Sequence, residues 1–208
     1  MIDQVAFPSG IWRPLLTLVL ASAVIMGSPG PSTISATAVG AAFGFRRSLR
    51  YACGLILGTT AVLFAVAMGV VAILLSVPQG APVLAAISAV YILYLAFKIA
   101  TAPPLTSQSR PMAAPAFAGG FLLAIANPKA YLAIAAVFAG STIFVENHAL
   151  DAAVKTALLS VMIVIIHVCW LSAGASLSRV LHDPASSRIV NVSLAAGLVV
   201  ATFVAFMS

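Results

Sequence analysis

The chain has 208 residues, of which 62% are hydrophobic and only 7% are charged. An average soluble domain carries about 25% charged and about 45–50% apolar residues, so this composition excludes a soluble globular enzyme, a disordered chain and a nucleic-acid-binding domain. The net charge of +6 would otherwise suggest a nucleic-acid partner, but long apolar runs separate the basic residues. The composition predicts an all-α membrane protein with the lipid bilayer as its solvent.

The positions of the charges divide the chain into apolar segments of the length that a bilayer requires. A transmembrane helix needs about 20 apolar residues. The uncharged segment 51–97 is therefore long enough for two helices, with a turn at Val77–Pro82. The sequence predicts one transmembrane domain over 1–208, in which a proline-rich linker at 102–115 joins halves at about 14–101 and 116–208. The six predicted transmembrane helices are 15–44, 51–76, 83–101, 117–140, 154–177 and 189–207.

Lys and Arg are distributed unevenly between the two sides of these predicted helices. If the N-terminus is outside, the outward segments hold only Arg13 and Lys155, whereas the inward connections hold seven basic residues. Basic residues favour the cytoplasmic side, so we expect a multi-pass protein with both termini outside. The seven inward residues are Arg46, Arg47, Arg50, Lys98, Arg110, Arg179 and Arg188.

The first and fourth predicted helices are each interrupted in the middle. The first lies in the uncharged run 14–45, which would be about 48 Å long as a continuous helix, against a hydrocarbon core of about 30 Å. It contains Pro29, Gly30 and Pro31, which favour a break into two half-helices. In the fourth, Asn127 followed by Pro128 is typical of the first residues of a helix.

The two breaks occupy matching positions. Pro29 and Pro128 are 99 residues apart, and the second and fifth predicted helices begin 101 residues apart, at Tyr51 and Ala152. This agreement indicates a duplication of three helices. Because three is odd, the second copy would be inverted in the membrane. Inverted repeats with helices broken near the midplane indicate a transporter's binding site, although kinks alone are an alternative interpretation.

Lys129 is the most informative single residue. It stands near the centre of a segment that is otherwise uncharged from 111 to 145, too far from either end of a continuous helix for its side chain to reach the interface. An ionisable residue within the membrane indicates function by default. A bound anion would use both its ammonium and the free N–H groups of the half-helix start. The alternative is a re-entrant fourth helix that brings Lys129 to the interface.

His167 is the midpoint of the uncharged run 156–178, and its charge can change near neutral pH, which makes it a candidate for a coupling proton. Cys53 and Cys169 fall inside predicted helices, which favours buried thiols over a disulfide. His167 and Cys169 point to different sides of a helix. We therefore predict neither a metal site nor a cofactor.

The two break motifs resemble those of the LysE/RhtB family of amino-acid exporters. The glycines of 40–58, the segment Tyr91–Leu95 and the segment Gly120–Leu123 agree with that resemblance, which covers essentially the whole chain. Ser32 and Ala124 depart from it, because the family often has Asn there. The resemblance implies an exporter of amino acids or their derivatives in the bacterial inner membrane, driven by the proton motive force.

The sequence predicts a secondary exporter of a small zwitterionic or anionic metabolite, and not an enzyme. The cargo's ammonium would bind backbone carbonyls freed by the breaks, and its carboxylate would bind Lys129 and the half-helix starts. All four acids fall in predicted loops or at the N-terminus, so a dibasic cargo is not expected. Two alternatives stay open: export of a metal ion or another inorganic solute, and a non-transporting partner in a membrane assembly. The sequence is also compatible with a homo-oligomer. The predicted substrate-binding residues are Pro29, Gly30, Pro31, Ser32, Thr33, Asn127, Pro128 and Lys129.

Overall fold

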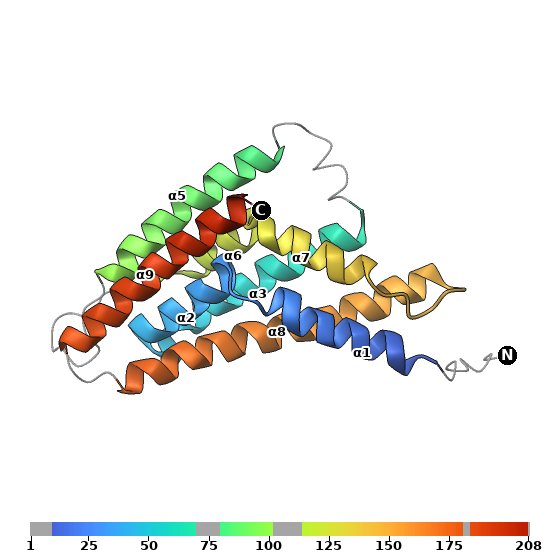
Figure 1. The fold of residues 1–208 in the computed structure, drawn as a ribbon, viewed down its shortest axis with the longest axis horizontal. Helices are drawn as coiled ribbons and strands as arrows, with labels where there is room; N and C mark the ends of the chain where they lie inside the picture. Colours follow the sequence, from blue (N-terminus) through green and yellow to red (C-terminus); the bar gives the residue numbers. More distant parts are fainter. Residues whose placement is uncertain (1–9, 70–79, 102–113, 181–183, 208) are drawn as a thin grey trace.

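A computed structural model of the chain describes residues 10–69, 80–101, 114–180 and 184–207. The secondary structure of this described part is helical and contains no strand (Figure 1). Its elements in chain order are α1 (Trp12–Ala21), a π-helix (Ser22–Met26), α2 (Pro31–Phe43), α3 (Phe45–Ala67), α5 (Gly80–Ala100), α6 (Phe117–Ala126), α7 (Pro128–Ala139), α8 (His148–Val180) and α9 (Pro184–Met207).

Both predicted helix breaks are confirmed. The helix formed by α1 and the π-helix ends before Gly27, and α2 begins at Pro31 in a direction bent by 65°. α6 and α7 meet at Asn127 with a bend of 62°. Pro31 and Pro128 each occupy the first position of the second half-helix, where the missing N–H costs no hydrogen bond.

The helices have the length and composition of a membrane protein. Among the described residues, α3 and the segment His148–Leu177 of α8 are each long and apolar enough to span a bilayer, and each bent pair passes the same test as one span. The other two predicted spans, 83–101 and 189–207, coincide with α5 and α9. The count of six crossings stays a prediction.

The helix ends differ from the prediction at the basic connection. Arg46, Arg47 and Arg50 were expected in a loop, but they lie exposed in the first two turns of α3. The chain turns from α2 into α3 at the single residue Gly44, whose φ of 74° is accessible to glycine and strained for other residues. In the predicted turn at Val77–Pro82, residues 80–82 already belong to α5. Residues 77–79 of that turn and residues 102–113 of the predicted linker lie outside the described residues.

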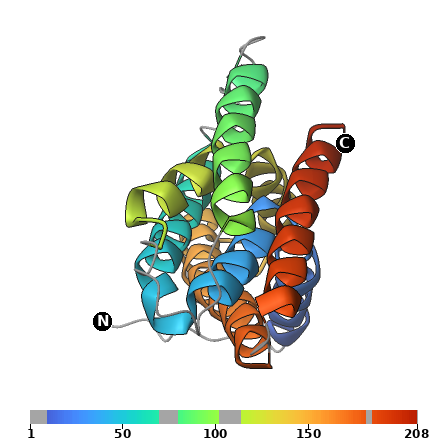
Figure 2. The same ribbon diagram turned by 90° about the vertical axis from the view of Figure 1, so that its left-hand side faces the viewer.

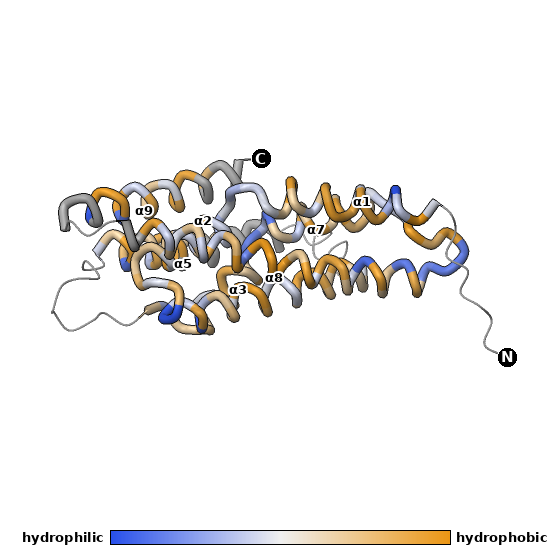
Figure 3. Tube along the Cα trace, turned by 90° about the horizontal axis from the view of Figure 1, so that it is seen from below, coloured by the Kyte–Doolittle hydropathy of each residue, from blue (hydrophilic) through white to orange (hydrophobic). Residues whose placement is uncertain are grey.

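Close helix pairs form the centre of the bundle. α2 packs on α8 and α3 packs on α6, while α5 and α9 lie side by side along one flank (Figures 1 and 2). Glycines allow the backbones to approach: a Cβ at Gly174 of α8 would lie 2.0 Å from the Thr37 carbonyl oxygen, and one at Gly54 of α3 would lie 2.1 Å from the Phe117 carbonyl oxygen. Hydrophobic residues dominate the helices along their length, and hydrophilic residues gather mostly at the two ends (Figure 3).

Gly174→Ala is expected to lower the free energy of unfolding by about 1–3 kcal/mol, because the new methyl group meets the backbone of α2, which has to shift. Gly197→Ala in α9 is the matched control, since a Cβ there has open space, and alanine favours the helix by about 1 kcal/mol. Thermal unfolding of both variants in detergent measures the difference. Equal melting temperatures would contradict the close packing of α8 on α2.

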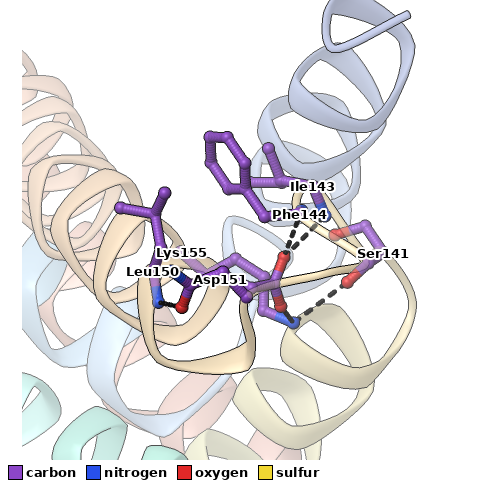
Figure 4. Close-up of polar contacts among 7 residues, drawn as sticks. Ser141, Ile143, Phe144, Leu150, Asp151 and Lys155 are labelled. Carbon is purple, nitrogen blue, oxygen red and sulfur yellow. Dashed lines mark hydrogen bonds and ion pairs between the residues drawn. The ribbon is translucent and has the colours of Figure 1, made fainter. Parts of the chain in front are cut away.

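A buried ion pair at the start of α8 contacts the connection between α7 and α8 (Figure 4). Asp151 was expected in a loop, but it lies in the first turn of α8 with 6% of its surface exposed. Its carboxylate accepts hydrogen bonds from the N–H groups of Ile143 and Phe144, at 2.6 and 3.0 Å, and pairs with Lys155 at 2.8 Å. The Lys155 ammonium also donates to the Ser141 carbonyl at 3.0 Å. The ion pair therefore holds the loop against the start of α8.

The cysteine prediction is wrong about burial. Cys53 on α3 and Cys169 on α8 are within helices, as predicted, but both are free thiols on the exposed outer surface of the bundle. Ala, Val and Leu cover that outer surface as readily as the core in an apolar chain, so composition alone does not tell the two environments apart.

Candidate functional site

The two helix breaks, almost 100 residues apart in the sequence, are in direct contact. The buried side chain of Asn127, which precedes α7, donates from Nδ2 to the Oγ of Ser32 in the first turn of α2 at 2.9 Å. Trp170 of α8 donates from its indole nitrogen to the Gly27 carbonyl at 3.1 Å. Asn127 and α8 therefore hold the interrupted segment of the first predicted helix in place.

The positively charged ammonium of Lys129 lies at the contact between the two helix breaks. Its Nζ donates to the Ser28 carbonyl at 2.9 Å, the Ser28 hydroxyl at 2.7 Å and the Pro29 carbonyl at 2.6 Å. An ammonium has three N–H groups, so these oxygens occupy all of them. Gly30 makes the approach possible, because a Cβ there would lie 2.7 Å from the Cδ of Lys129. Lys129 is half-buried and links the breaks of the first and fourth predicted helices.

Both half-helices point their first turns toward this contact. At the start of α2 the Gly30 N–H donates to the Thr33 hydroxyl at 2.9 Å, so one of the free donors is satisfied within the chain. At the start of α7, Asn127 caps no N–H group with its side chain. Uncapped N–H groups at a helix start carry partial positive charge and favour an anion.

A partly open pocket lies beside the breaks. Ile134 and Ile163 of its wall belong to the apolar cluster that α1, α3, α7 and α8 form. Lys129 is the one lysine, and no carboxylate is present, among the residues of its wall. The residues that line the pocket are Met26, Ser28, Gly30, Ser32, Thr33, Thr59, Asn127, Lys129, Ala130, Ala133, Ile134, Ile163, Ile166 and His167.

Three polar atoms of this wall are buried without a hydrogen-bond partner among the described residues: His167 Nε2, Thr59 Oγ1 and Asn127 Oδ1. A buried polar group without a partner costs about 1–3 kcal/mol. Most buried polar atoms in proteins are paired, so three unpaired ones around one pocket suggest a polar ligand.

The comparison with known proteins decides the family. The family model described as LysE type translocator matches residues 23–207. The chain belongs to the LysE type translocator family. Two relatives named cysteine/O-acetylserine efflux protein are those of Salmonella choleraesuis, 32% identical over 174 residues, and Escherichia coli K12, 33% identical over 176 residues. Each alignment covers 83% of this chain and 87% of the relative. No solved structure shows a significant match.

Family membership establishes the general class of the protein. LysE type translocators are transporters, so this translocator is not an enzyme, as predicted. Together with the apolar helices it is a multi-pass membrane protein. The composition had excluded soluble classes, and the break motifs had indicated this family.

The translocator brings the predicted site residues to one place. Gly30, Ser32, Thr33, Asn127, Lys129 and His167 all line the pocket. Pro29, Pro31 and Pro128 do not appear in its wall, but they set the break, and the Pro29 carbonyl binds Lys129. Ser28 and Thr59 also line the pocket, and Trp170 holds the break, although none of the three was predicted as a site residue. Ser28 was adjacent to the motif, whereas nothing in the sequence distinguishes Thr59 from its neighbour Thr60.

Proposed function

We propose that this translocator exports a small neutral amino acid or amino-acid derivative across the bacterial inner membrane. The observation that carries the proposal is the ammonium of Lys129, which lies half-buried in the pocket where the two broken helices meet. The names of the relatives support a cargo of the size of cysteine or O-acetylserine.

The cargo's carboxylate binds Lys129 and the first turns of α2 and α7. Ser32, Thr33 and Asn127 add neutral hydrogen bonds around it. Because all three N–H groups of Lys129 have partners in this structure, a carboxylate replaces one of the oxygens of Ser28 or Pro29. The carboxylate also carries a negative charge, so it attracts the ammonium by a charge–charge interaction that the neutral oxygens of Ser28 and Pro29 do not provide, which favours the exchange. Cargo binding then loosens the link between the two breaks.

The transport cycle follows from an inverted repeat. Six crossings, formed as two inverted three-helix repeats with both termini outside, place the breaks of the first and fourth helices near the midplane. Two states related by that symmetry open the pocket to one side and then to the other. The matching breaks at Gly27–Gly30 and Asn127, with nearly equal bends, support this arrangement.

The cargo is neutral overall, and proton entry drives its export. Among the described residues, no carboxylate lines the pocket to balance a second cationic group, which disfavours a dibasic amino acid such as lysine. His167 is the one histidine in the pocket wall, and an imidazole can take up and release a proton, so it serves as the coupling group.

Overproduction of the protein in a bacterial strain is expected to raise resistance to toxic analogues of small neutral amino acids, and to raise the concentrations of cysteine and O-acetylserine in the medium. Growth on a panel of such analogues, beside dibasic ones, measures the substrate class. The matched comparison is a strain that overproduces Lys129→Ala at equal membrane abundance. Unchanged growth on the whole panel would argue against amino-acid export.

A further inference from the structure

The pocket wall has a second polar region besides the Lys129 contact, formed by the polar atoms that have no hydrogen-bond partner. His167, Thr59 and Asn127 have only 4%, 5% and 3% of their surfaces exposed, and each still has one polar atom without a partner among the described residues. None of these atoms belongs to the Lys129 contact. They come from α8, α3 and the residue before α7, so three separate elements contribute to one wall.

The hydrogen bonds that these residues do make fix what the free atoms can offer. His167 Nδ1 lies 2.8 Å from the Ile163 carbonyl, which can only accept, so the proton of the neutral ring is on Nδ1 and Nε2 has a free lone pair. Asn127 donates to Ser32 from Nδ2, which leaves Oδ1 as an acceptor. The Thr59 hydroxyl can turn to accept or donate. The free atoms of this wall are therefore predominantly acceptors.

We propose that His167 Nε2, Asn127 Oδ1 and Thr59 Oγ1 form the acceptor subsite for the cargo's amino group. The inference rests on the proposed function and adds the binding mode: the carboxylate lies at Lys129 and the amino group lies at the acceptors. The backbone carbonyls of Ser28 and Pro29, the alternative acceptors at the break, both accept from Lys129 in this structure, and a bound carboxylate would release at most one of them. An amino group has three N–H donors, which matches three acceptor atoms.

This arrangement makes the cargo compete with a proton for the same lone pair. A proton on Nε2 turns that atom into a donor, which repels an ammonium, so His167 holds either a proton or the amino group. Lys129 on α7 is the other ionisable group in the pocket wall. Four elements pack on α8, and none of them adds another ionisable group to the pocket wall. α2 and the π-helix contain no ionisable residue. The ionisable residues of α1 and α3, all outside the pocket wall, are Arg13, Arg46, Arg47, Arg50, Tyr51 and Cys53.

The test compares cargo pairs that differ only in the amino group. The probes are L-cysteine against 3-mercaptopropionate and O-acetyl-L-serine against 3-acetoxypropionate, with affinities measured by calorimetry on the purified full chain in lipid nanodiscs. The wild type is expected to bind each amino acid at least about 10-fold more tightly than its deamino analogue, because a hydrogen bond to a charged group is lost. Its affinity for the amino acids is expected to fall as the pH falls from about 8 to 5.

Two substitutions at His167 distinguish its role as a hydrogen-bond acceptor from its role as a group that takes up a proton. His167→Asn keeps a donor for the Ile163 carbonyl but removes the atom at Nε2, so the preference for the amino acid is expected to fall to about threefold or less. His167→Gln places an amide oxygen near Nε2, so the preference is expected to persist while the pH dependence disappears. Thr59→Val is expected to weaken the preference, and Thr60→Val, one position along α3 and outside the pocket wall, is the control.

The outcomes distinguish the subsite from the function. A wild type that binds neither amino acid contradicts the proposed function itself. A wild type that binds both members of each pair equally overturns the subsite and leaves amino-acid export standing. An unchanged preference in His167→Asn, or an equal loss of both members of each pair, also overturns it.

Discussion

Replacing Lys129 by alanine is expected to abolish export while leaving the protein in the membrane. The substitution removes the positive charge in the pocket and also the three hydrogen bonds to Ser28 and Pro29. Loss of one partner of a desolvated charge pair costs about 2–5 kcal/mol, so we expect the export rate at low cargo concentration to fall about 100-fold or more. Accumulation of O-acetylserine in the medium of producing cells measures it.

Lys98→Ala is the matched control for Lys129→Ala. Lys98 lies in the last turn of α5, so this variant loses the same charge outside the pocket. Its export rate is expected to stay within about twofold of the wild type, because single surface charges change energies by under about 0.5 kcal/mol. Wild-type export by Lys129→Ala, at equal membrane abundance, would refute the role assigned to that ammonium.

Asp151→Ala is expected to destabilise the fold more than Gly174→Ala does. It leaves the Lys155 ammonium, 5% exposed, without its ion-pair partner, and it leaves the N–H groups of Ile143 and Phe144 without an acceptor. Removal of one partner of a buried ion pair costs about 3–5 kcal/mol. Thermal or chemical unfolding of the purified protein in detergent measures the loss.

Two further variants show which interaction of Asp151 matters. Asp151→Asn keeps an acceptor oxygen for the loop but removes the charge, so its stability is expected to lie between those of the wild type and the alanine variant. Glu146→Ala removes an exposed acid from the same connection and is expected to change little. A melting temperature of Asp151→Ala equal to that of Glu146→Ala would show that the ion pair does not hold the loop.

Most of the fold was predictable because the bilayer imposes simple rules on the sequence. Uncharged runs of sufficient length gave the helices, and proline beside glycine or asparagine gave both breaks. The basic connection differs from the prediction because a charged residue does not by itself mark a loop. Arg46, Arg47 and Arg50 instead extend from the exposed side of α3 once Gly44 has turned the chain. The same assumption placed Asp151 outside α8, where Lys155 and the loop N–H groups satisfy its charge.

The candidate site was predictable where its residues break a rule of membrane helices, and only there. Lys129, Asn127 and the prolines are visible in an apolar chain because each is costly in lipid. Thr59 is not visible, because the spans contain many Ser and Thr residues and only the rotation of α3 decides which of them meets the pocket. That rotation depends on the packing of Gly58 against Phe121 and Ala124 of α6, a contact between segments that the sequence alone does not relate.

Transport by the purified protein tests the central claim most directly. Wild-type protein is reconstituted into liposomes loaded with labelled O-acetyl-L-serine, cysteine or lysine, and release of the label is followed under an imposed pH gradient. We predict release of the two neutral amino acids but not of lysine, with the gradient accelerating it and Lys129→Ala reducing it to the level of protein-free liposomes. Retention of both neutral amino acids by wild-type vesicles for as long as by protein-free ones would contradict the account.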